Sequence, residues 1–91
     1  MPHSLETRRK RLRYRTSHTG TRETDILVGG FISRHVDELD EQAVVALEEL
    51  MAGANDRDIL DWVTERAPLP ERFRNETTAR LIAFVRERPR S

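Results

Sequence analysis

The chain has no cysteine, which excludes a disulfide framework, a thiol nucleophile and a metal site built from cysteines. Hydrophobic residues make up 36% of the sequence and aromatic residues 5%. A domain of 91 residues buries only about 60–65% of its unfolded surface, so we expect one modest core and little room for a deep, dry cleft. No apolar run approaches the roughly 20 residues of a membrane span, and no apolar signal segment opens the chain. We therefore expect one helical domain over residues 1–91, with an ordered core of about 6–87, in a soluble intracellular protein.

Residues that could carry chemistry are also scarce. His3, His18 and His35 stand far apart, and none has a second ligand at helical i+4 spacing. Serines occur only at positions 4, 17, 33 and 91, none of them in a nucleophile motif. Gly29 and Gly30 are not followed by the glycine and lysine of a phosphate-binding loop. We expect a non-catalytic protein with no metal and no tightly bound cofactor.

Helical signals run through the whole sequence and predict an all-α fold, a small bundle of five short helices. The expected helices cover 5–17, 22–35, 41–52 and 56–66, with a fifth falling within 71–87. Ser4, Asp40 and Asn55 stand where N-caps are needed. Asn75 opens a glycosylation pattern, but without a secretion signal a helix cap or chance is the better explanation.

Apolar residues at helical spacing predict the buried faces. In the second helix we expect Ile26 to lie inward with the apolar residues that follow it, and Tyr14 to extend the thin stripe of the first helix. The interior pair Gly29-Gly30 should allow close approach of another helix. Trp62 is expected to be half buried against the last helix, or else to be an exposed anchor for a partner.

Charge is balanced overall but segregated along the chain. The 16 basic residues equal the 16 acidic ones, yet residues 1–22 carry a net charge of +6 and the remainder −6. Such a pattern indicates either an oriented contact with a partner or a basic helix lying against acidic helices of the same molecule. We expect one of these two arrangements.

The stretch HTGTRETD, residues 18–25, lies between the basic run and the second helix. Gly20 can end one helix, Thr21 can cap the next, and Glu23 and Asp25 complement the helix dipole. Those roles do not explain Arg22 at the same helix end, where the dipole disfavours a cation. A bidentate donor beside an acceptor, next to a glycine, also suits recognition of a partner.

The order of these segments resembles the succinate dehydrogenase assembly factor 2 family, the flavinator proteins. The similarity covers about residues 6–85 and includes RRKRLRYR, GTRETDILVGGF, DELDEQAVVALEELM and NDRDILDWV. Gly20, Glu23 and Asp25 match the family motif Arg-Gly-x-x-Glu and the aspartate that usually follows it. Thr19 replaces the arginine of that motif. Either a neighbour such as Arg15 or Arg22 has taken over the basic role, or the protein is altered there.

The resemblance implies a small five-helix protein that binds the flavoprotein subunit of succinate dehydrogenase, or of fumarate reductase in some bacteria. Such proteins promote covalent attachment of FAD, which remains the cofactor of the partner. It also implies a cytoplasmic protein in a bacterium, or a mitochondrial matrix protein in a eukaryote, acting without a membrane or nucleic acid and as a monomer.

On this basis we predict a docking face built around the motif, consisting of Arg9, Arg13, Arg15, His18, Gly20, Arg22, Glu23 and Asp25. The alternative hypothesis is an antitoxin-like or nucleic-acid-binding module that uses the arginine-rich first helix.

Overall fold

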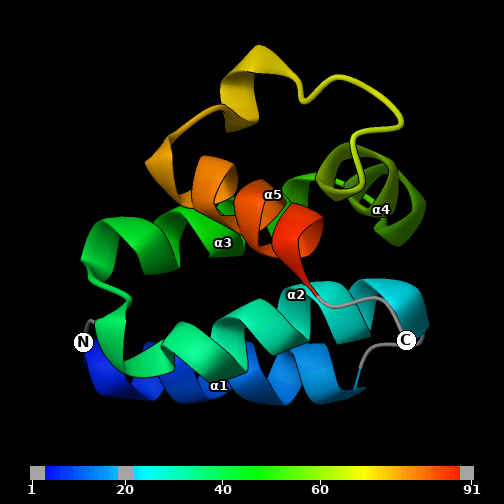
Figure 1. The fold of residues 1–91 in the computed structure, drawn as a ribbon. Helices are drawn as coiled ribbons and strands as arrows, with labels where there is room; N and C mark the ends of the chain where they lie inside the picture. The colour runs from blue at the N-terminus through cyan, green and yellow to red at the C-terminus, as the bar shows by residue number, and fades with distance from the viewer. Residues whose placement is uncertain (1–3, 19–21, 89–91) are drawn as a thin grey trace.

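The computed structural model describes residues 4–18 and 22–88, which form five α-helices, two short 3-10 helices and no strand. The predicted all-α fold is therefore confirmed for this part of the chain. The α-helices are α1 (Leu5–His18), α2 (Arg22–His35), α3 (Glu41–Gly53), α4 (Asp56–Val63) and α5 (Glu76–Glu87). The 3-10 helices are η1 (Val36–Glu38) and η2 (Glu71–Phe73). Figure 1 shows their arrangement.

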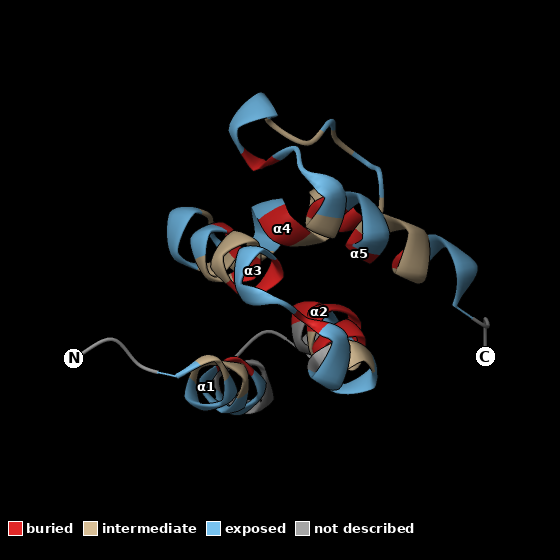
Figure 2. Cartoon of the chain, turned by 90° about the vertical axis from the view of Figure 1, so that its left-hand side faces the viewer, coloured by how far each residue is buried: buried red, intermediate tan, exposed pale blue. Residues whose placement is uncertain are grey.

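Helix α2 lies in the middle of the molecule. It packs against α1 on one side and against α4 and α5 on the other (Figures 1 and 2). The segment 64–75, which includes η2, lies at the side of the molecule opposite α1 in both views. One apolar core joins these layers, and its fully buried members include Leu12, Phe31, Ile32, Leu47 and Leu81.

The three N-caps predicted from the sequence are confirmed. The Ser4 hydroxyl accepts from the Thr7 amide at 3.2 Å. The carboxylate of Asp40 accepts from the Ala43 amide at 2.8 Å, and Asn55 caps α4 in the same way. Each cap satisfies an amide that the first helical turn leaves unpaired, which is why the starts of these helices could be predicted closely.

The predicted end of the fourth helix is wrong. α4 stops at Val63 rather than at residue 66, because Glu65 adopts a left-handed backbone with φ 65°. The Glu65 amide donates to the Trp62 carbonyl at 3.1 Å, and the Arg66 amide donates to the Asp61 carbonyl at 2.8 Å. These two bonds form a Schellman ending, in which glycine usually holds the left-handed position.

The interior glycines were predicted to allow close approach of another helix; at Gly30 a neighbouring helix is present, but its contact does not require glycine. A Cβ atom on Gly30 would lie 3.7 Å from the ring of Phe84 on α5, which is ordinary van der Waals contact. The same ring lies 5.6 Å from the Phe31 ring, centroid to centroid and edge to face. α2 and α5 therefore meet through an aromatic contact beside a residue without a side chain.

Candidate partner-binding surface

The predicted docking face lies where α1 ends and α2 begins. Gly20, together with Thr19 and Thr21, falls outside the described residues. Arg15, His18, Arg22 and Asp25 belong to the helices, but their side chains are not described. The side chains that the structure does describe are those of Arg9, Arg13 and Glu23.

Helix α2 is fixed to α4 at its first turn. Thr24 is only 3% exposed, and its hydroxyl donates to the carbonyl of Asp56 at 3.0 Å. Consecutive helical residues point about 100° apart, so an inward Thr24 leaves its neighbour Glu23 exposed. Within the described part of the chain, the Glu23 carboxylate forms no ion pair. The first turn of α2 thus presents the exposed Glu23 carboxylate as a hydrogen-bond acceptor, on a helix that is bonded to α4 through Thr24.

Two arginines of α1 are used inside the fold. Arg8 pairs with Glu48 of α3 and lies 3.7 Å from Glu41. The hydrogen bond to Glu48 raises the pKa of the Arg8 guanidinium, and attraction to the same carboxylate adds to the effect. The guanidinium of Arg9 donates to the buried Leu39 carbonyl, at 2.8 Å from Nε. Part of the basic helix therefore lies against acidic and polar groups of the same chain.

Other cations of α1 point outward. Arg11 and Arg13 are exposed, and they flank the buried Leu12 in the chain. Of the two arrangements that the sequence left open, the structure shows the basic helix against an acidic one, because Arg8 attaches α1 to α3. The contact with a partner stays a prediction.

Two apolar side chains near this surface were predicted wrongly. Ile26 is 67% exposed and Tyr14 65% exposed, although both were expected to lie on buried faces. The inward stripe of α2 consists of Thr24, Leu27 and Val28, with later residues at i+4 from these, so Ile26 falls outside it. Ile26 follows Glu23 at i+3, which puts both on one outward face. Strict helical spacing would have identified it as an exposed apolar contact.

The described residues contain neither a candidate metal site nor a membrane-spanning helix. No three histidine or acidic side chains there are grouped so that they could hold a metal ion. No described helix is long and apolar enough to cross a membrane.

A charged outward surface on a small helical bundle, with an acceptor held at a fixed helix end, is a surface that suits a protein-binding module. The chain belongs to the family described as flavinator of succinate dehydrogenase, whose model matches residues 10–85. That match takes in most of α1 and all of α2, α3 and α4.

The chain is similar in sequence to a bacterial and to a mitochondrial assembly factor. The chain is similar to the FAD assembly factor SdhE of Acetobacter pasteurianus, with 35% identity over 85 residues, covering 93% of this chain and 77% of that protein. It is also similar to succinate dehydrogenase assembly factor 2-B, mitochondrial, of Drosophila melanogaster, with 32% identity over 83 residues. That match covers 90% of this chain and 53% of the fly protein, so the chain spans about half of that relative. No solved structure gives a significant match.

Proposed function

We propose that this chain binds the flavoprotein subunit of succinate dehydrogenase, or of fumarate reductase, and promotes covalent attachment of FAD to it. The observation that carries the proposal is the family match over residues 10–85, which includes the surface around the start of α2. The names of the relatives, an FAD assembly factor and a succinate dehydrogenase assembly factor, agree with this role.

In this proposal the chain acts by binding and not by catalysis. The flavin and the flavoprotein supply the chemistry, and this chain holds the flavoprotein in a competent arrangement. Exposed Glu23 accepts hydrogen bonds from the partner, while Arg13 and Arg22 meet its carboxylates or the flavin phosphates. The bond from Thr24 to α4 keeps the acceptor in place, and exposed Ile26 adds apolar contact.

The placement of the arginines supports protein binding over the nucleic-acid alternative. Phosphate binding depends on the number of cations that can reach the backbone, and Arg8 and Arg9 already bond to α3 and to the Leu39 carbonyl. We also propose that the free protein is a monomer. In the described part of the chain, only Tyr14 and Ile26 are large apolar residues with high exposure, which supports this.

The proposal is tested by mixing the protein with the apo flavoprotein subunit and FAD, denaturing the mixture and measuring flavin fluorescence in the gel. Covalent labelling should be faster with the protein than without it. No acceleration with either flavoprotein would refute the proposed function, provided that Thr19→Arg does not restore it. Restoration by that variant would identify Thr19 as the cause of a weakened motif.

Glu23→Ala tests the role given to the motif. We expect labelling to slow by about tenfold or more, because a hydrogen bond to a charged group is worth about 1.5–3 kcal/mol. Glu76→Ala is the matched control, since Glu76 is also an exposed glutamate in the first turn of a helix and has the same dipole effect. Full activity of Glu23→Ala, or an equal loss in the control, would show that Glu23 has no specific role. Gly20→Arg should also abolish labelling with helicity unchanged.

A further inference from the structure

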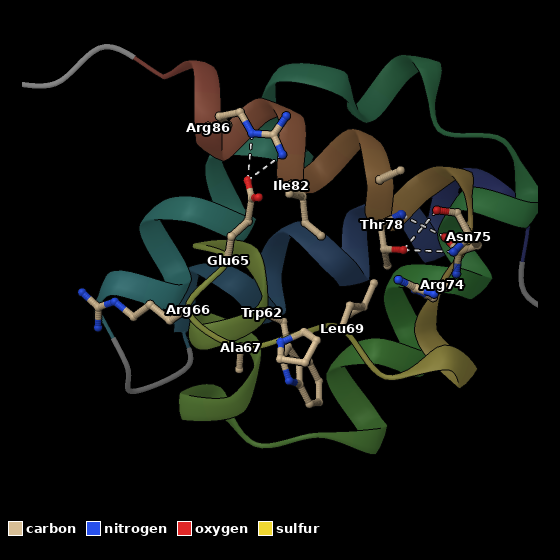
Figure 3. Close-up of a pocket in the computed structure, with 12 residues that line it drawn as sticks. Trp62, Glu65, Arg66, Ala67, Leu69, Arg74, Asn75, Thr78, Ile82 and Arg86 are labelled. Carbon is tan, nitrogen blue, oxygen red and sulfur yellow. Dashed lines mark hydrogen bonds and ion pairs between the residues drawn. The ribbon is translucent and has the colours of Figure 1, made fainter.

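A second surface lies on the side of the molecule opposite α1, between the end of α4, the segment 64–75 and α5 (Figures 1 and 3). It is a groove of about 720 Å³. Nothing in the proposed role of the α1–α2 surface uses it. Its lining includes Trp62, which the sequence offered as a possible anchor for a partner, and Asn75 of the glycosylation pattern.

The floor of the groove is apolar. Trp62, Leu69 and Ile82 come from three different segments and gather there (Figure 3). All three are half buried, so each still presents apolar surface to solvent. The Trp62 ring packs against the ring of buried Phe73, with ring centroids 5.5 Å apart. A rigid aromatic floor of this kind favours an apolar anchor from a ligand.

The rim of the groove is basic. Arg66, Arg74 and Arg86 surround the apolar floor on three sides, with Glu65 as the one acidic residue in the lining (Figure 3). Glu65 is already paired with Arg86 at 2.8 Å. Within residues 4–18 and 22–88, neither Arg66 nor Arg74 pairs with a carboxylate. In a chain with equal numbers of acidic and basic residues, two exposed guanidiniums beside an apolar floor are available for an external anion.

The spread of these charges decides what kind of ligand fits. The guanidiniums stand apart around the floor and do not converge on one point (Figure 3), so they match several separate carboxylates better than one phosphate. We propose that the groove binds an acidic peptide segment of a partner protein, with an aromatic or aliphatic side chain on Trp62 and Ile82 and flanking carboxylates on Arg66 and Arg74. Arginine suits such contacts because its planar fork binds carboxylates with two parallel bonds.

Trp62 is the only tryptophan in the chain, so its fluorescence reports occupation of the groove directly. The probe is a synthetic capped peptide, Asp-Glu-Asp-Phe-Leu-Asp-Glu, titrated into the full chain. The comparison peptide has asparagine and glutamine in place of every acid. We expect a saturable change in Trp62 emission with the acidic peptide, and binding at least about tenfold weaker with the neutral one.

The groove variant is Arg66→Gln/Arg74→Gln, and its control is Arg11→Gln/Arg57→Gln, which removes two exposed charges elsewhere. We expect the groove variant to weaken binding of the acidic peptide at least about tenfold, or about 1.4 kcal/mol, and the control to change it little. Glu23→Ala should leave this binding unchanged, which separates the groove from the proposed flavinylation role. Three outcomes would each overturn the proposal: no saturable response, equal binding of the neutral peptide, or equal weakening in the control variant.

Discussion

Thr78 is expected to be one of the most sensitive polar positions in the fold. It is 2% exposed, and its hydroxyl has two roles at the start of α5. It donates to the Phe73 carbonyl at 2.7 Å and accepts from the Asn75 amide at 3.1 Å. In return, the Asn75 side chain accepts from the Thr78 amide at 2.9 Å. The two residues thus form a reciprocal cap that also ties η2 to α5.

Thr78→Val keeps the shape of the side chain and removes only the hydroxyl. Two hydrogen bonds are lost, the one to the Phe73 carbonyl and the one from the Asn75 amide, while the Phe73 carbonyl keeps the bond from the Asn75 side-chain amide at 3.2 Å. Each lost bond is worth about 0.5–1.5 kcal/mol, so we expect the free energy of unfolding to fall by about 2 kcal/mol. The assay is urea unfolding followed by circular dichroism, with the slope m unchanged.

Thr78→Ser is the matched control, because serine keeps the hydroxyl and loses only a buried methyl group. That loss should cost about 1 kcal/mol, less than the valine substitution. The double variant Asn75→Ala/Thr78→Val should cost more than the sum of its parts, because only the double variant removes both donors of the Phe73 carbonyl. If the valine variant were as stable as the serine variant or more so, the hydroxyl would not be the stabilising group and the reasoning would be wrong.

Two further predictions concern the end of α4. Glu65→Gly should raise the Tm by about 4–8 °C, because a left-handed backbone costs a residue other than glycine about 1–2 kcal/mol and the exposed ion pair that the variant loses is worth little. The control Glu65→Ala keeps that backbone cost and should show no rise in Tm. An equal rise in both variants would contradict the explanation. The hydrogen bond from Arg86, aided by its charge, lowers the pKa of Glu65. The pair therefore stabilises the fold above the ordinary pKa of glutamate, and this stabilisation is lost as the pH falls through the lowered value. Unfolding of Arg86→Gln should accordingly differ from wild type near neutral pH and coincide with it in acid, and a difference that persists in acid would assign another role to Arg86.

The helix starts were predictable because their signals are local. Ser4, Asp40 and Asn55 each accept a hydrogen bond from the amide three residues ahead. Each cap therefore depends only on residues close together in the sequence. The end of α4 was not predictable in this way. Its left-handed residue is Glu65 and not glycine, so the usual signal was absent and Pro68 suggested a later end.

The exposed position of Ile26 shows a different limit. An apolar run predicts that a helix has a buried face, but only the spacing within the run says which of its members lie on that face. Leu27, Val28, Phe31 and Ile32 are buried at helical spacing, and Ile26 falls outside their stripe. The bond from Thr24 to the Asp56 carbonyl fits the same rotation of α2, which turns Ile26 outward beside Glu23.

The groove depends still more on the tertiary fold. Trp62 and Ile82 meet only because the segment 64–75 carries the chain from α4 back to α5, and Arg74 reaches the same space from the residue before the α5 cap. No spacing in the sequence indicates that these residues share a surface. By contrast, the motif around Glu23 is contiguous in the chain and could be predicted from its residue types. If both surfaces bind as proposed, the sequence indicates the surface around Glu23 and names Trp62 as a candidate anchor, whereas only the packing of α4 and α5 shows which residues join Trp62 in the groove.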